Sequence, residues 1–243
     1  MKALEFLKGV GIVVALDTSD IDLIRRVVEI TSGVKDVTGY KIGLEASISH
    51  GLRTIVKFIR SISDKPVIYD HQKAMNDTPH IGRGFARVLR EAGVDAAIGF
   101  PHAGPKTMVA WIEALRDEGV IPIIGGEMTH EGYLRSEGGY MCDDAPERIY
   151  STALELGIEH FVLPGNKVDK ALKYAEIIAR KARDPVFLLP GARMYSDWDR
   201  ISSEMIPLYR NVHLIVGRAI LRKDLSADML EAMARRLKGY GGK

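Results

Sequence analysis

The sequence predicts a (β/α)₈ TIM barrel, an α/β fold in which eight parallel strands alternate with helices. Short apolar runs rich in β-branched residues alternate along the chain with longer segments of helical spacing. The 243 residues match the length of one such barrel, and the 46% of apolar residues can fill its core. We therefore expect residues 1–243 to form a single barrel domain.

Eight apolar runs are the expected strands. They are continuously apolar rather than alternating, as is typical of parallel strands with helices on one side and packed side chains on the other. In chain order the runs are residues 12–17, 40–45, 67–73, 95–101, 120–128, 160–165, 186–192 and 212–220. Because a helical segment follows each run, closure into a barrel is the expected outcome.

Four of the intervening helices carry start signals. These are residues 18–20 before the first helix, Pro105 at the start of the fourth, residues 144–147 before the fifth and residues 226–228 before the last. An open Rossmann-like sheet is the competing architecture, but residues 16–20 lack the Gly-x-Gly-x-x-Gly loop that would follow its first strand. The barrel is therefore favoured.

One long connection, residues 130–143, is rich in glycine and tyrosine. Loops of this length in a compact domain are often lids over a binding site. This loop is the candidate lid of the barrel.

Composition excludes several classes of partner. A net charge of +2 provides no basic excess for a nucleic acid, so an anionic partner is expected to be small. The single cysteine, Cys142, excludes an intramolecular disulfide and every metal site with several cysteines. The charged first residues and the lack of an apolar run of about 18 residues argue against secretion and a membrane span. We expect a cytoplasmic protein.

Charged residues gather where the expected strands end, and in a barrel these positions meet at one rim. Charges there are costly unless they pair, so Lys41, Asp70, Lys73 and Asp77 predict an alternating carboxylate–ammonium network. Taken alone, each of these residues equally fits a stabilising ion pair. The full set at the strand ends is Asp17, Lys41, Glu45, residues 70–73, Asp77, His102, residues 127–130, Asn166, Arg193 and Arg218.

A phosphate site is predicted after the last two strands. Residues 190–193 and 216–219 lie where many barrels hold a phosphate. Gly191 and Gly217 let backbone N–H groups approach an anion, and Arg218 adds a bidentate charge. The alternative is that the glycines serve tight turns and Arg218 pairs with a surface carboxylate.

No metal site is expected. His71, His102 and His130 could lie near one rim, but they lack His-Glu-x-x-His or similar ligand spacing. Cys142 has no activating cation nearby in the sequence and is not expected to be a catalytic thiol.

Taken in order, the strand-end residues resemble those of orotidine 5'-phosphate decarboxylases over nearly the whole chain. The most specific combination is a lysine-bearing third strand, Glu-Met-Thr-His after the fifth and Gly-Arg in the eighth. The matching segments are Ala15-Leu16-Asp17, Tyr40-Lys41-Ile42-Gly43, residues 70–77, Glu127-Met128-Thr129-His130 and Val216-Gly217-Arg218.

The resemblance implies roles for the charged array. Lys73 would donate a proton to C6 of the pyrimidine as carbon dioxide leaves, with Asp70 beside the departing carboxylate. Lys41 and Asp77 would complete the array. In the family the second aspartate enters from the neighbouring protomer, which implies a homodimer with shared active sites.

The resemblance also implies how the nucleotide binds. Asp17 would hold the ribose hydroxyls and Thr129 the edge of the pyrimidine. The 5'-phosphate would lie against Gly191, Gly217 and Arg218, with Pro190 and Arg193 in the same loop. No metal or organic cofactor is implied.

Two departures from the family pattern stand out. The usual motif is Asp-x-Lys-x-x-Asp, whereas two residues separate Asp70 from Lys73 and three separate Lys73 from Asp77. In a regular strand positions i and i+3 face opposite sides, so Asp70 and Lys73 converge only if the strand bulges or ends between them. In addition, residues 193–196 replace the usual glycine- and glutamine-containing phosphate loop, and Arg193 is a candidate substitute for the missing contact.

These departures keep two alternatives open. One is a Mg²⁺-dependent sugar-phosphate decarboxylase or aldolase of the same barrel group, with Glu45 and Asp70 as metal ligands. The other is a barrel that binds a phosphorylated ligand without catalysis, although every charged residue type of the catalytic array is present.

Overall fold

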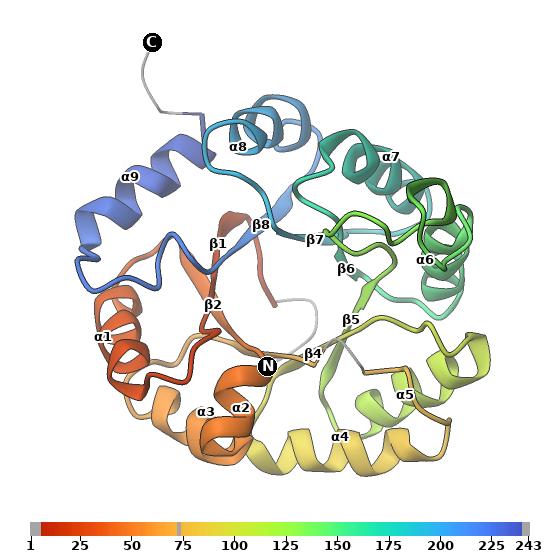
Figure 1. Ribbon diagram of the computed structural model, residues 1–243, viewed down its shortest axis with the longest axis horizontal. Helices are drawn as coiled ribbons and strands as arrows, with labels where there is room; N and C mark the ends of the chain where they lie inside the picture. Colours follow the sequence, from red (N-terminus) through yellow and green to blue (C-terminus); the bar gives the residue numbers. More distant parts are fainter. Residues whose placement is uncertain (1–5, 72–73, 240–243) are drawn as a thin grey trace.

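The computed structural model describes residues 6–71 and 74–239. Eight parallel strands pair in chain order, and the eighth pairs with the first, so the sheet closes into a barrel (Figure 1). The strands are β1 (Val10–Ala15), β2 (Val37–Ile42), β3 (Val67–Asp70), β4 (Ala96–Gly99), β5 (Ile121–Gly125), β6 (His160–Val162), β7 (Val186–Pro190) and β8 (Asn211–Val216). The predicted (β/α)₈ fold is confirmed.

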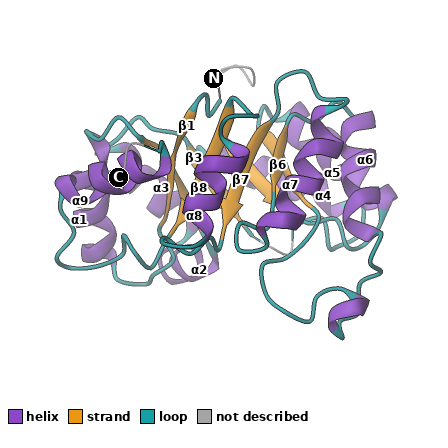
Figure 2. Cartoon of the chain, turned by 90° about the horizontal axis from the view of Figure 1, so that it is seen from above, coloured by secondary structure: helices purple, strands orange, loops and turns teal. Residues whose placement is uncertain are grey.

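Helices surround the barrel and cover its outer face (Figures 1 and 2). They are α1 (Ile21–Ser32), α2 (Leu44–His50), α3 (Leu52–Arg60), α4 (Ile81–Ala92), α5 (Pro105–Asp117), α6 (Ala145–Glu155), α7 (Val168–Ala179), α8 (Asp197–Arg200) and α9 (Ala227–Leu237). Among the described segments, no helix combines the length and apolar character needed to cross a bilayer.

Helices begin at all four predicted starts, and two of these starts have a side-chain hydrogen bond that caps the helix. The carboxylate of Asp20 accepts from the backbone N–H groups of Asp22 and Leu23, and this caps α1. Pro105 occupies the first turn of α5, where its missing N–H has no cost. The hydroxyl of Ser226 accepts from the N–H of Met229 at the start of α9.

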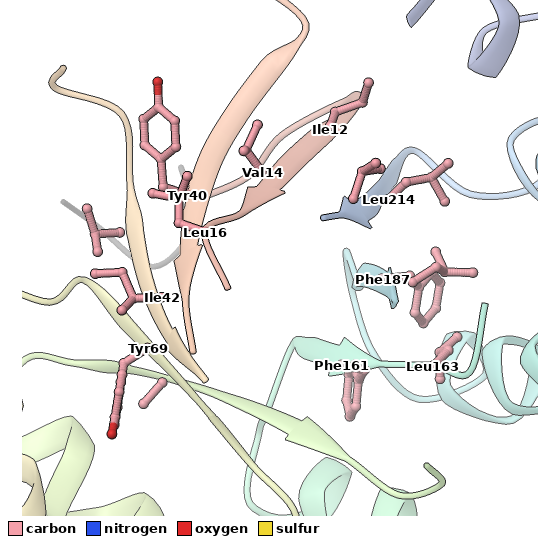
Figure 3. Close-up of a cluster of buried hydrophobic side chains, with 14 of the residues drawn as sticks. Ile12, Val14, Leu16, Tyr40, Ile42, Tyr69, Phe161, Leu163, Phe187 and Leu214 are labelled. Atoms are coloured by element: carbon pink, nitrogen blue, oxygen red, sulfur yellow. The ribbon is translucent and has the colours of Figure 1, made fainter. Parts of the chain in front are cut away.

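The core has two layers, because successive strand residues point to opposite faces. In β1, Ile12 and Val14 belong to the layer between the sheet and the helices, part of which Figure 3 shows. Val13 and Ala15 belong to the layer inside the barrel. The same alternation places Tyr40 and Ile42, Val67 and Tyr69 toward the helices.

This alternation also fixes the direction of the charged residues. Lys41 lies between Tyr40 and Ile42, and Asp70 lies two positions after Ile68, a residue of the inner layer. Asp17 likewise lies two positions after Ala15. By this alternation, all three residues occupy positions that face the inside of the barrel. They lie at the carboxyl ends of their strands, toward which the arrows point in Figure 2.

Some expected strand bounds were wrong at their carboxyl ends. The second run was expected to reach Glu45, but β2 ends at Ile42 and Glu45 lies in α2. The third was expected to reach residue 73, but β3 ends at Asp70. The residues that follow each strand at the rim were included in the expected runs, but they do not form the backbone hydrogen bonds of the sheet. The expected runs are therefore longer than the strands.

Candidate active site

The centre of the site is a lysine held between two aspartates. The ammonium of Lys41 donates to both carboxylate oxygens of Asp17, at 3.1 and 2.9 Å, and to Oδ2 of Asp70 at 3.0 Å. Lys41 is only 7% exposed, and its bond to Asp70 lies largely out of water, whereas the side chain of Asp17 is 45% exposed. Three consecutive chain segments, at the ends of β1, β2 and β3, supply the three groups.

Electrostatics keep this lysine charged. Burial alone would lower the pKa of Lys41, but attraction to Asp70 and Asp17, with their hydrogen bonds, outweighs it and raises the pKa. One oxygen of Asp70, Oδ1, is buried and has no hydrogen-bond partner among the described residues. A buried carboxylate oxygen of this kind is a strong acceptor and repels a second anion placed against it.

The position of Lys73 lies outside the described residues, so its role stays a prediction. The strand nevertheless ends at Asp70, and the N–H of Ala74 then donates to the carbonyl of His71 at 2.7 Å in a turn. A strand that ends between Asp70 and position 73 is one of the two conditions under which these residues were expected to converge.

Within one chain, Asp77 is not among the described partners of Lys41, and its expected place in the charged array, as an aspartate from a neighbouring protomer, stays a prediction. Asp77 is exposed, and its carbonyl accepts from the hydroxyl of Thr107 in α5. It lines a neighbouring cavity of about 510 Å³, with residues of α2 and α4. This cavity adjoins the site, because Leu44, Ile48, His71 and Asn76 also border the hollow that contains Lys41 and Asp70.

Two connected hollows open on the Asp17, Lys41 and Asp70 cluster. A hollow of about 420 Å³ extends toward β7 and β8, and one of about 830 Å³ extends toward the ends of β2, β3 and β4. The first contains all of the predicted phosphate residues, namely Pro190, Gly191, Arg193, Gly217 and Arg218. The second contains Gly43, Glu45, His71, Asn76, His102 and Met128.

The two arginines on the phosphate side differ. Arg218 is exposed at the mouth of the first hollow and forms no ion pair with another described residue. The guanidinium of Arg193 instead donates twice to the carboxylate of Asp197, at 2.9 Å each, and its backbone N–H donates to the same group at 2.8 Å. Arg218 is therefore the better placed of the two to meet an anion.

Thr129 reaches the same site from β5. Gly191 has a φ of +79°, and a Cβ there would lie 3.0 Å from Cγ2 of Thr129, so the two residues lie side by side with no room for a larger side chain at position 191. The side-chain amide of Asn166 donates to the carbonyl of Thr129 at 2.8 Å and fixes its backbone. The predicted pyrimidine and phosphate residues thus meet at one rim.

Metal ligands were not expected, and the described residues contain no group of three histidine, cysteine or acidic side chains arranged to hold an ion. Nε2 of His102 is hydrogen-bonded to the hydroxyl of Tyr133 at 2.7 Å. Glu45, the ligand considered for Mg²⁺, accepts from the N–H of Ser19 at 2.9 Å. Cys142 is exposed.

The sequence did not predict the partners of Glu127. This residue lies at the start of the Glu-Met-Thr-His segment, and its buried carboxylate accepts from Lys167, Lys170 and Tyr174. The spacing of the two lysines, three residues apart at the start of a helix, is a signal that both lie on one face. Their acidic partner is 40 residues earlier, which no local pattern indicates.

Solved structures of known proteins share the fold of this chain. A solved orotidine 5'-monophosphate decarboxylase from Methanocaldococcus jannaschii, in complex with the inhibitor BMP, superposes with a TM-score of 0.75 at 21% identity, covering 97% of this chain and 100% of that one. Orotidine 5'-phosphate decarboxylase from Pyrococcus horikoshii OT3 gives a TM-score of 0.75 at 19% identity, covering 94% and 99%. No curated protein matches the sequence.

The decisive match is to a family model. It covers residues 11–233, which include every described strand except the first residue of β1. The chain therefore belongs to the orotidine 5'-phosphate decarboxylase / HUMPS family and is an enzyme of the carboxy-lyase class.

Proposed function

We propose that this enzyme converts orotidine 5'-monophosphate to uridine 5'-monophosphate in pyrimidine biosynthesis, without a metal and with Lys73 as the proton donor. The observation that carries the proposal is the cluster of buried Lys41 with Asp17 and Asp70, which borders the same hollow as Gly191 and Arg218. A nucleotide anchored there by its phosphate would present its base to the charged cluster.

The chemical step breaks the bond between C6 and the carboxylate. Carbon dioxide leaves, the electron pair stays on C6, and a proton from the ammonium of Lys73 neutralises it. The free oxygen Oδ1 of Asp70 would face the substrate carboxylate and raise the energy of the bound substrate relative to the transition state. Lys41 holds Asp70 in place through its 3.0 Å hydrogen bond.

The remaining contacts bind the nucleotide. Backbone N–H groups near Gly191 and Gly217, together with Arg218, hold the phosphate. Thr129, which touches the Gly191 turn, hydrogen-bonds the pyrimidine edge, and Asp17 holds the ribose hydroxyls. Binding energy from the phosphate, far from C6, can then contribute to the chemical step.

We also propose a homodimer with shared sites. Four large apolar side chains are exposed on α2 and α4, namely Leu44 (49%), Ile48 (73%), Ile81 (41%) and Val88 (53%). Leu44, Ile48 and Val88 line the cavity that contains Asp77. A second copy seated on this apolar face would cover it and bring its own Asp77 toward the active site of the first.

A hybrid experiment tests the shared site. Asp77→Asn and Lys73→Ala chains, each inactive alone, are mixed under conditions that exchange subunits. Recovery of up to about one quarter of wild-type activity is expected, since a random mixture forms one intact site in half of its dimers. No recovery, with exchange verified by mass, would show that each chain uses its own Asp77.

Loss of the ultraviolet absorbance of the orotate ring tests the reaction itself. The purified chain is expected to consume orotidine 5'-monophosphate at an equal rate with and without a chelator. Activity that disappears on chelation and returns with Mg²⁺ would favour the metal-dependent alternative. Tight binding of both nucleotides without turnover would indicate a non-catalytic barrel.

A further inference from the structure

A buried ionic cluster lies directly beside the segment that carries Thr129. The carboxylate of Glu127 is fully buried, and its Oε1 accepts from the ammonium groups of Lys167 and Lys170, both at 2.8 Å. Its Oε2 accepts from the hydroxyl of Tyr174 at 2.5 Å. A carboxylate removed from water in this way is stable only while these partners stay in place.

A second carboxylate, from the long loop, closes the cluster. Glu137 accepts from Lys167 at 2.9 Å and from Lys170 at 2.8 Å, and its Oε2 also lies 3.3 Å from the N–H of Tyr133. We call Glu127, Lys167, Lys170 and Glu137 the four-charge cluster. It is neutral overall, with two cations between two anions, and without Glu137 it would carry an excess positive charge.

Closing the cluster fixes the loop against the barrel. In Figure 1 the green segment after β5 lies beside α6 and α7, and Glu137 bonds to two lysines at the start of α7. Within the same loop, the hydroxyl of Tyr133 donates to the carbonyl of Gly126 at 3.0 Å and is hydrogen-bonded to Nε2 of His102 at 2.7 Å.

These bonds lie beside the end of β5, and none of them is made by a residue that borders the hollow of Gly191 and Arg218. Glu127 and Gly126 immediately precede Met128 and Thr129, and Met128 and His102 both line the larger hollow. None of the four charged residues borders the hollow that contains Gly191 and Arg218. The cluster is therefore arranged to set the position of residues 128 and 129 without contacting a ligand.

We infer that Glu137, Lys167 and Lys170 are positioning residues that hold Thr129 in place for the pyrimidine, so that their loss impairs recognition of the base but not of the phosphate. The inference rests on the proposed function, since it assigns the larger hollow to the base. Glu127 is not the residue to replace in a test, because its burial makes misfolding the expected result.

The test compares two ligands that share the phosphate. Uridine 5'-monophosphate and ribose 5-phosphate are titrated against wild type, Glu137→Gln, Lys170→Met and Lys170→Arg. Glu137→Gln and Lys170→Met are expected to weaken binding of the nucleotide at least tenfold and that of ribose 5-phosphate less than twofold. Lys170→Arg keeps the charge and is expected to restore nucleotide binding to within threefold of wild type.

A matched control uses the neighbouring surface pair Lys173–Glu147, on α7 and α6, whose side chains are 63% and 39% exposed. Glu147→Gln removes a carboxylate from a lysine as Glu137→Gln does, and it is expected to change neither affinity. Amide hydrogen exchange over residues 131–139 is expected to accelerate at least tenfold in Glu137→Gln and to stay unchanged in the control.

Three results would overturn the inference. They are equal losses for both ligands, unchanged nucleotide affinity despite faster exchange in the loop, and wild-type protein that does not bind uridine 5'-monophosphate. The turnover assay judges the proposed function separately. Wild-type protein that binds uridine 5'-monophosphate but never consumes orotidine 5'-monophosphate would contradict the proposed function. The comparison of nucleotide and ribose 5-phosphate affinities would still test the positioning role.

Discussion

At the scale of single residues, the site depends on where charges find partners. Lys41 is tolerated in the barrel lumen because two aspartates accept from it. The sequence indicated a network with Asp70, because charges at strand ends are costly alone, but not the bonds to Asp17. Arg193 and Arg218 were both candidates for the phosphate site. The structure distinguishes them, because Asp197, four residues after Arg193, binds its guanidinium while Arg218 faces the hollow.

The first prediction concerns Arg218. Arg218→Ala is expected to weaken binding of uridine 5'-monophosphate by about 2–3 kcal/mol, the scale of a lost charge-assisted contact to phosphate. Isothermal titration measures the loss. Arg222→Ala is the control, because Arg222 pairs with Asp224 on the surface of the same loop. Equal affinities for Arg218→Ala and wild type would remove Arg218 from the phosphate site.

At the scale of elements, strands and helices were predictable because their signals are local. Apolar runs marked all eight strands, and Asp20 and Ser226 marked helix starts that the structure confirms. The ends of strands were less predictable, as β3 shows by ending at Asp70. Beyond that point spacing in the sequence does not give the path of the chain, so the position of Asp77 at a cavity lined by α2 and α4 was not predictable from it.

The second prediction belongs to the turn after β7. Gly191→Ala is expected to lower the free energy of unfolding by about 1–2 kcal/mol, because alanine disfavours a positive φ. The substitution also places a methyl group 3.0 Å from Thr129. Gly119→Ala is the control, since Gly119 has a φ of +71° with open space around it. Both variants are expected to lose similar stability in urea unfolding, but only Gly191→Ala is expected to lose nucleotide affinity, at least tenfold. Equal affinities in the two variants would contradict the contact.

At the scale of the whole molecule, the barrel separates its two ends. The carboxyl ends of the strands carry the site, while two buried histidines, His160 and His213, lie nearer the opposite end, beside Phe6 and Leu7. Burial, as the largest cause, lowers the pKa of each to about 4. These histidines are accommodated as neutral groups and therefore make the fold sensitive to acid.

The third prediction is this pH dependence. Between the unfolded histidine value of 6.5 and about 4, the unfolded chain binds protons that the folded chain excludes, so stability falls as the pH falls. Each histidine contributes on the order of 3 kcal/mol, at about 1.4 kcal/mol per pKa unit. His102, whose pKa burial also lowers, adds to the same slope.

Urea unfolding at pH values from 5 to 7 measures the effect. His160→Gln is expected to reduce the slope of unfolding free energy against pH, while stability above pH 7 changes less. Most carboxylates titrate below this range, as Glu137 does with a pKa lowered to about 2, chiefly by its hydrogen bond from Lys170. A flat profile between pH 5 and 6.5 in the wild type would contradict the assignment.

The central claim is that an ammonium group at position 73 delivers the proton to C6, and one measurement tests it most directly. Orotidine 5'-monophosphate is mixed with wild-type or Lys73→Ala protein in the presence of a chelator, and orotate absorbance is followed while binding of uridine 5'-monophosphate is checked in parallel. The wild type is expected to consume the substrate, and Lys73→Ala is expected to bind the product with no detectable turnover. Turnover by Lys73→Ala close to that of the wild type would contradict the account.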